Sequence, residues 1–452
     1  MPRLTPALLS EYLRFFVSLG VGLLLTPLLL QYFGKDQFGV WITLGSLVGT
    51  FGVLDLGLGG SMPKLFAEHF ATGNLQALNR LISTLLTFFT AGALFLLLAL
   101  IPLSLPLERF LHIPDGYLEI GRVTLLILSL NFSVSFVANV LYSLLFGMQK
   151  LQISNMIGIV ALLFLITAIA GALYFGYGLV GVALANLGSN LFGFLTTFFY
   201  LKKRFPHLHI RWGIFDWPLL KKALSLSLYV FVGNIGMQVI FNTDNLVISR
   251  FLGLAQVATY AIAFRLCYFC MNFVFNFSKV FLPRFSELHA TNKMELLGET
   301  FLKLSRVSVT TGGCLVVVLF FFGETLIRFW TRGPYFVGDN TFFTLILLLL
   351  TTPAIQAGTT TLLGMGKIKA TTCMILAEAV LNITLSIFLA GPLGVWGVAC
   401  GTVLAQWATN GWFVPWYTLR KLQLPAKTYW KRVLLPGMFV WILLFFAIWS
   451  VL

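Results

Sequence analysis

Thirteen long apolar stretches run along this chain and limit what it can fold into. Each holds about 20 or more mostly apolar residues, the length that a helix needs to cross the hydrocarbon core of a bilayer. Strict alternation of apolar and polar residues is absent, so we expect helices rather than the strands of a membrane barrel. The predicted fold class is therefore all-α, a polytopic membrane protein. The expected spans are residues 10–32, 37–60, 80–103, 120–146, 155–175, 179–201, 223–248, 256–280, 301–324, 341–364, 369–390, 394–418 and 433–452.

The composition excludes a soluble protein. Hydrophobic residues make up 58% of the 452 residues and charged residues only 10%, against roughly 25% charged residues in soluble domains. The net charge of +15 would suit nucleic acid, but the cations lie in short loops between spans, so membrane lipids are expected as partners and nucleic acid is not. All five cysteines lie in apolar stretches, which favours packing over disulfide or redox chemistry.

The positions of lysine and arginine predict the orientation in the membrane. On the side of the N-terminus the loops and helix ends carry 22 cations, and on the opposite side they carry 6. Cytoplasmic loops hold the excess of lysine and arginine in membrane proteins. The N-terminus is therefore predicted to be cytoplasmic. The loop 203–222 also carries aromatic residues among its cations and is expected to lie at the membrane interface on anionic lipid.

An internal repeat divides the chain into two halves. Residues 34–41 (GKDQFGVW) match 253–260 (GLAQVATY), and 63–69 (PKLFAEH) match 283–289 (PRFSELH). Residues 147–150 (GMQK) match 364–367 (GMGK), and 178–183 (GLVGVA) match 394–399 (GVWGVA), at offsets of 216 to 220 residues. The repeat predicts two six-helix lobes related by a pseudo-twofold axis along the membrane normal, plus one extra C-terminal helix. The predicted divisions are an N-terminal lobe at 1–202, a cytoplasmic linker at 203–222, a C-terminal lobe at 223–420 and the additional helix at 421–452. Two such lobes would enclose a cavity that opens to each side alternately, as in a transporter.

These motifs resemble those of the multidrug/oligosaccharidyl-lipid/polysaccharide flippase superfamily, within it the Wzx-type O-antigen flippases. The resemblance rests on residues 34–41, on the segment DLGLG at 55–59, on the GMxK pairs and on GxxGVA, and it covers about residues 8–420. It implies a flippase that moves undecaprenyl-diphosphate-linked oligosaccharide to the outer leaflet of a bacterial inner membrane. Sodium or proton coupling, and work alongside a polysaccharide polymerase machinery, are implied with it. No cofactor is expected.

Charged side chains inside the spans are the candidate substrate-binding residues, because each is costly to insert into a membrane. Arg14 lies one turn into the first span, where it could receive the diphosphate with Asp55 as its resting partner. Alternatively, Arg14 reaches back to the interface and Asp55 caps a glycine-rich helix end. Arg265, near the middle of the eighth span, could bind the diphosphate or form an ion pair with Glu378. Lys279 on the same helix is either a third substrate cation or an interfacial one.

Three polar residues of the second half are the cation-coupling candidates. Asp244 lies in the seventh span, and Glu378 and Asn382 lie one helical turn apart in the eleventh. Together they could supply hard oxygen ligands to a cation. Relatives of the lipid II flippase type use acidic and amide residues on these two helices for sodium. Proton exchange at Glu378 is the alternative.

Two other functions compete with a Wzx-type flippase. Another superfamily member, a drug exporter or a lipid II flippase, would share the fold, although exporters of organic cations favour acidic cavities. A membrane-bound enzyme acting on lipid-linked sugars would need catalytic residues in its outer loops. Those loops, 104–119 and 325–340, hold one histidine, His112, and no acid–base pair. A phosphate-binding glycine loop is also absent, so no ATPase is expected and the chain is predicted to be a secondary transporter.

Overall fold

The computed structural model describes residues 4–104, 115–208, 210–367 and 369–450. His112 lies outside these residues. Every regular element of the described part is a helix, which confirms the predicted fold class. Ten of these helices are long and apolar enough to cross a membrane.

The chain forms two compact units. The first consists of residues 1–238 with 253–255, and the second of 239–252 with 256–452. The exact residues predicted to divide the lobes stay a prediction.

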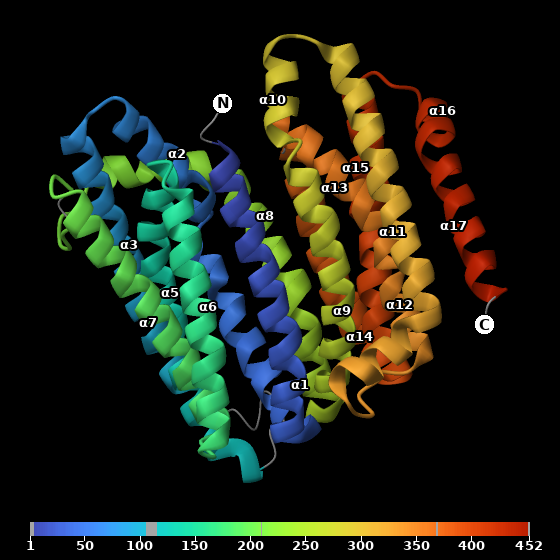
Figure 1. Ribbon diagram of the computed structural model, residues 1–452, viewed down its shortest axis with the longest axis horizontal. Helices are drawn as coiled ribbons and strands as arrows, with labels where there is room; N and C mark the ends of the chain where they lie inside the picture. Colours follow the sequence, from blue (N-terminus) through green and yellow to red (C-terminus); the bar gives the residue numbers. More distant parts are fainter. Residues whose placement is uncertain (1–3, 105–114, 209, 368, 451–452) are drawn as a thin grey trace. The chain divides into compact units, whose positions relative to one another are not determined.

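The first unit packs its helices around a core of leucine and phenylalanine. α3, α5, α6 and α7 lie side by side in Figure 1, and α5 contacts α2, α3 and α7. Fully buried side chains such as Phe66, Phe89 and Leu144 form the centre of this core. Its helices are α1 (Leu4–Thr50), the 3₁₀ helix η1 (Phe51–Asp55), α2 (Leu58–Ala71), α3 (Leu75–Leu103), α5 (Asp115–Gly147), α6 (Leu151–Tyr174) and α7 (Gly178–Arg204).

The second unit is built mainly on α11, which contacts α13 and α17. α8 (Trp217–Phe251) belongs partly to each unit. The other helices are α9 (Leu254–Lys279), α10 (Leu282–Ala290), α11 (Met294–Thr331), α12 (Asp339–Ile346), α13 (Leu348–Gly364), α14 (Lys369–Gln406), the π-helix η2 (Trp407–Gly411), α15 (Trp412–Lys421), α16 (Ala426–Tyr429), the π-helix η3 (Trp430–Leu434) and α17 (Leu435–Trp449).

Two of the ten membrane-length helices each contain two of the predicted spans. α1 is interrupted by a non-helical residue at Gly34 (φ 65°), and α14 by one at Gly394 (φ 61°). Glycine suits both positions because a positive φ is costly for residues with a side chain. The spans expected at 10–32 and 37–60, and those at 369–390 and 394–418, are the arms on either side of these breaks. The second span ends earlier than expected, because η1 closes it at Asp55 and α2 starts a new helix at Leu58.

The repeat seen in the sequence is also present in the backbone of the two halves of the chain. Left-handed residues recur at matching positions, namely Gly34 and Gly253, Gly73 and Asn292, Gln149 and Gly366, and Gly178 and Gly394. The close helix contacts recur as well. A Cβ on Gly147 would lie 2.7 Å from the Cβ of Phe66, and one on Gly364 would lie 2.6 Å from the Cβ of Phe285. The two halves therefore share the same local construction.

Candidate substrate and cation sites

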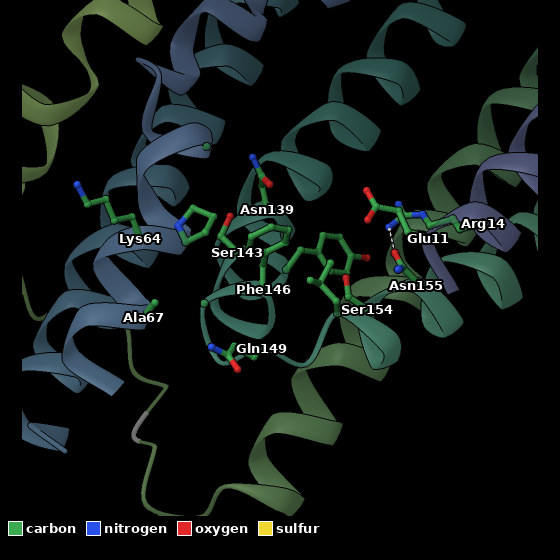
Figure 2. A pocket seen from close by; sticks show the side chains of 15 residues that line it. Glu11, Arg14, Lys64, Ala67, Asn139, Ser143, Phe146, Gln149, Ser154 and Asn155 are labelled. Atoms are coloured by element: carbon green, nitrogen blue, oxygen red, sulfur yellow. Dashed lines mark hydrogen bonds between the residues drawn. The ribbon is translucent and has the colours of Figure 1, made fainter. Parts of the chain in front are cut away.

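A pocket of about 850 Å³ opens in the first unit. α1, α2, α5 and α6 form it, and Figure 2 shows their side chains around it. The PKL and GMQK motifs of the repeat supply part of its wall, through Lys64 and Gln149. Its charged and amide-bearing lining residues are Glu11, Arg14, Lys64, Asn139, Gln149 and Asn155.

Arg14 lies on one wall of this pocket and carries a charge that no carboxylate neutralises in the described structure. Its Nη1 donates to Asn155 Oδ1 at 3.4 Å, and Asn155 Nδ2 donates to Ser10 Oγ at 3.0 Å. A Cβ on Gly158 would lie 2.9 Å from the guanidinium carbon, so the glycine leaves room for the arginine against α6. Glu11 points into the same pocket (Figure 2), but the two side chains form no ion pair. A guanidinium with free donors in a cavity of this size can bind a phosphate.

Asp55 is not the resting partner of Arg14. Both of its carboxylate oxygens accept the backbone N–H of Gly59, at 3.0 and 3.2 Å. The chain turns between η1 and α2 through Leu56 (φ 49°) and Gly57 (φ 72°), which brings the carboxylate onto the first turn of α2. A carboxylate there satisfies a free N–H and interacts favourably with the helix dipole. Of the two alternatives for Asp55, the structure shows the cap of a glycine-rich helix end and not the pair with Arg14.

Arg265 and Glu378 do not form the expected ion pair either. The guanidinium of Arg265 lies over the ring of Phe269, 5.9 Å from its centroid, in a weak cation–π contact on its own helix. Glu378 is occupied by donors from another segment. Ion pairs elsewhere in the described structure include Arg284–Glu287, Arg328–Glu324 and Arg432–Glu299. Arg265 is half-buried and Lys279 is exposed, as expected for an interfacial lysine.

Asp244 is the centre of a buried hydrogen-bond network in the second unit, where it is 3% exposed. Its Oδ2 accepts the hydroxyls of Tyr260 at 2.6 Å and Thr402 at 2.7 Å, and its Oδ1 accepts Ser386 at 3.3 Å. Asn382 joins the network by donating Nδ2 to Thr402 Oγ1 at 3.0 Å. The structure thus brings together two of the three predicted cation-coupling residues.

One oxygen in this network has no hydrogen-bond partner. Asn382 Oδ1 is fully buried and accepts no donor within the described structure. A buried amide oxygen without a partner costs free energy. With the carboxylate of Asp244 and the hydroxyl oxygens, it makes a set of hard oxygen donors that suits a small cation.

Glu378 belongs to a separate polar group, so the three predicted residues do not form one site. Its Oε2 accepts Asn410 Nδ2 at 2.6 Å and Thr409 Oγ1 at 3.3 Å. Both partners lie in η2, and π-helical turns often occur at functional positions. Asn382 and Glu378 differ in partners because Thr402 and Asn410 lie about two turns apart on the segment that faces them.

The sequence reasoning missed five of these polar residues: Tyr260, Ser386, Thr402, Thr409 and Asn410. Hydroxyl and amide groups in otherwise apolar spans are the signal that could have found them. In the sequence, Tyr260 is recognised only as the last residue of the repeat segment 253–260.

Comparisons with known proteins agree with this architecture. The family model described as "Polysaccharide biosynthesis protein" matches residues 13–289, which is more than half of the chain, and the MatE model matches residues 230–388. The chain belongs to the polysaccharide biosynthesis protein family. The resemblance to the flippase superfamily is thereby confirmed, and the protein is a multi-pass membrane protein.

Two curated relatives of this polysaccharide biosynthesis family member are similar along most of their length. The chain is 21% identical to the "Uncharacterized membrane protein EpsK" of Bacillus subtilis, over 94% of this chain and 83% of that one. It is 23% identical to the "Putative O-antigen export protein" of Yersinia pseudotuberculosis, over 88% of this chain and 92% of that one.

Solved structures show the same fold. The lipid II flippase MurJ in an inward closed conformation superposes with a TM-score of 0.74 at 17% identity, over 98% of both chains. An inward-facing multidrug resistance MATE transporter of the MOP superfamily superposes with a TM-score of 0.73 at 16% identity, over 88% of this chain and 94% of that one. At these identities the likeness shows the fold, and the neighbours that share it are transporters.

Proposed function

We propose that this family member is a flippase that moves a lipid-diphosphate-linked oligosaccharide, with undecaprenyl as the lipid, from the cytoplasmic to the outer leaflet. The unpaired guanidinium of Arg14 in its polar pocket carries the proposal. A lipid-linked oligosaccharide presents an anionic diphosphate and a polar glycan, and this pocket offers a cation together with amide and hydroxyl groups. The volume of about 850 Å³ admits a diphosphate and one or two sugar residues, with the lipid tail left in the bilayer.

Arg14 is proposed as the first ligand of the diphosphate, because the guanidinium fork matches phosphate oxygens better than a lysine ammonium does. Lys64 also lines the pocket and adds positive charge. Arg265 and Lys279 stay proposals as later contacts of the substrate, Arg265 being the half-buried one. Asp55 acts on the helix start rather than on the substrate in this proposal.

The driving force is proposed to be a cation gradient. Asp244, Asn382 and Thr402 are the proposed sodium ligands, because they combine a buried carboxylate with the unpartnered amide oxygen. Glu378 is the alternative, as a proton-exchanging residue with its own partners. Binding and release of the cation would bias the alternating-access equilibrium, since a ligand shifts a conformational equilibrium only by its differential affinity.

The predicted location, a bacterial inner membrane with a cytoplasmic N-terminus, is part of this proposal, as is a polysaccharide polymerase machinery that would use the product. The excess of cations on one side of the spans supports the orientation. The putative O-antigen export relative supports the substrate class.

A second candidate is a lipid II flippase, favoured by the fold shared with MurJ along almost the whole chain. Lipid II carries the same diphosphate chemistry, so Arg14 would serve both substrates. An exporter of organic cations fits less well, because Arg14 and Lys64 make the pocket positive and Glu11 is its single carboxylate.

The test is translocation of fluorescently headgroup-labelled undecaprenyl-diphosphate lipids in proteoliposomes, with sodium and pH gradients imposed separately. We expect Arg14→Gln to slow flipping by about 10- to 100-fold, the worth of one hydrogen-bonded ion contact, and Arg14→Lys to recover part of the rate. Arg80→Gln, which removes an exposed arginine outside the pocket, is the matched control and should flip normally. A wild-type rate for a well-folded Arg14→Gln protein would remove Arg14 from the site. Comparing an O-antigen-type glycan with a lipid II headgroup distinguishes the two candidates.

A further inference from the structure

The segment between α7 and α8 is fixed along the flank of α3 rather than lying free. Its residues 210–217, here called the aromatic loop, are held by three threonines spaced three residues apart on one face of α3. The hydrogen bonds run from Trp212 Nε1 to Thr90 Oγ1 at 3.0 Å, from Gly213 N to Thr87 Oγ1 at 3.0 Å and from Asp216 N to Thr84 Oγ1 at 3.1 Å. The loop therefore has a defined height along α3.

That height places the loop's apex at the depth of the lipid chains. Arg80 is the last charged residue of α3, and residues 81–103 carry no charge. A hydrocarbon core about 30 Å thick corresponds to about 20 residues at 1.5 Å per residue. Counted back from Leu103, the core begins near Thr84, so Trp212 at the level of Thr90 lies about six residues, or ~9 Å, inside it.

Three polar groups of the loop have hydrogen-bond partners on α3. Irregular backbone at membrane depth is tolerated only where its polar groups are satisfied, and the threonine hydroxyls of α3 accept two backbone N–H groups and the indole N–H. On one side of the segment, Leu208 and Leu220 are buried in the core of the first unit. On the other side, large apolar side chains are exposed: Trp212 (45%), Ile214 (48%), Phe215 (48%) and Trp217 (58%).

A basic rim borders these apolar side chains. The ring of Phe198 on α7 lies 6.4 Å from that of Trp212, and one turn further on α7 ends with Lys202, Lys203 and Arg204, all exposed. Arg211 within the loop and Lys221 beyond it add exposed charge. The one acidic residue of the stretch, Asp216, already accepts the N–H of Leu219 at 3.1 Å.

We infer that the aromatic loop is a membrane-inserted anchor that binds anionic phospholipids. The rings of the loop lie in the outer part of the hydrocarbon core, and Lys202, Lys203 and Arg204 lie ~6–9 Å nearer its edge than Phe198 along α7, from where their long side chains can reach the phosphates. The partner is therefore a phospholipid with a net negative headgroup, such as phosphatidylglycerol, in the leaflet on the side of the α7 C-terminus. This lipid contact is separate from the Arg14 pocket, which lies among α1, α2, α5 and α6.

The first experiment measures lipid-dependent stability of the full-length protein in detergent, titrated with phosphatidylglycerol or phosphatidylcholine. We expect phosphatidylglycerol to raise the Tm of the wild type more than phosphatidylcholine does. The variant K202Q/K203Q/R204Q should lose at least half of that difference. The matched control K293Q/K303Q/R306Q removes three exposed cations at and near the start of α11 and should keep the full difference between the two lipids. If both variants lose the difference in Tm between the two lipids equally, the lipid is attracted to positive charge in general, and the inference is overturned. The inference is also overturned if both variants keep the full difference in Tm.

The second experiment measures depth in vesicles of phosphatidylcholine with 30% phosphatidylglycerol, an amount chosen at about the anionic content of a bacterial membrane. Ile214→Cys and Lys203→Cys are labelled with an environment-sensitive fluorophore in a background whose five native cysteines are replaced by serine and which keeps the wild-type Tm. We expect lipids that carry a doxyl quencher on the chain to quench the label at 214 and aqueous iodide to quench the label at 203. Iodide quenching at 214 without doxyl quenching would overturn the membrane insertion.

Discussion

Replacing Asp244 by asparagine separates the charge of this side chain from its hydrogen bonds. Its Oδ2 accepts two short hydrogen bonds, from Tyr260 and Thr402, and its Oδ1 accepts a longer one from Ser386. An asparagine can place its carbonyl oxygen where Oδ2 was and direct its amide at Ser386, whose hydroxyl can accept as well as donate. The hydrogen bonds are thereby kept, and the negative charge is removed.

The expected change in the free energy of unfolding is small for asparagine and larger for alanine. Charge-assisted hydrogen bonds are stronger than neutral ones, but a buried carboxylate also carries a desolvation cost, so we expect Asp244→Asn to change stability by less than about 2 kcal/mol. Asp244→Ala leaves the fully buried Tyr260 hydroxyl without its acceptor and leaves a void, at a combined cost of about 3–5 kcal/mol.

The assay is thermal unfolding of the purified protein as sodium replaces choline at constant ionic strength. If Asp244 binds sodium, a concentration ten times the dissociation constant stabilises the wild type by about 1.4 kcal/mol. Asp244→Asn should show no sodium-dependent rise in Tm, and its flipping should lose its response to a sodium gradient. The control Glu324→Gln removes an exposed carboxylate of α11 and should behave as the wild type does. A full sodium-dependent rise in the folded Asp244→Asn protein would refute the assignment.

Three further substitutions test the sites and the repeat. Gly158→Ala puts a Cβ 2.9 Å from the guanidinium of Arg14. Because the arginine side chain can move, we expect a Tm within about 2 °C of wild type and a several-fold slower flipping rate. An unchanged flipping rate would show that Arg14 need not lie against α6. Glu378→Gln keeps hydrogen-bonding capacity but cannot release a proton, so a flipping rate that still responds fully to a pH gradient would exclude Glu378 as the proton carrier. Gly147→Val forces apart α2 and α5 at Phe66 and should lower the free energy of unfolding by about 2–4 kcal/mol through overpacking. A wild-type Tm would contradict the close contact.

Arg14 and Arg265 both lack a carboxylate partner among the described residues, and of the two Arg14 is the one that lines the pocket. Asp55 bonds to a helix start, Lys279 is exposed, and Glu378 has hydroxyl and amide donors. A membrane cation whose neighbours are amides and a glycine is available to an anionic substrate. This availability is the physical basis of the proposed function.

The sequence by itself determined the helices, the membrane environment and the repeat. In lipid, every backbone polar group must have a hydrogen-bond partner, and a span must have a minimum length. Runs of apolar residues therefore predict spanning helices without knowledge of the tertiary contacts. The repeated glycines at 34 and 253 could be recognised because each meets a local demand, a positive φ. Such demands depend on a few neighbouring residues.

Only the tertiary structure decided which polar side chains meet. Asp244 and Thr402 are 158 residues apart in the sequence, and Arg14 and Asn155 are 141 residues apart. Their contacts depend on helix rotation and packing, which a hydropathy pattern does not describe. The sequence placed Arg14 near Asp55 and Arg265 near Glu378 by depth alone. Depth fixes one coordinate of a side chain, while the direction in which it leaves the helix axis is set by packing against the neighbouring helices. For that reason depth alone left two alternatives for Asp55 and for Arg265, and the structure shows neither the Arg14–Asp55 nor the Arg265–Glu378 pair.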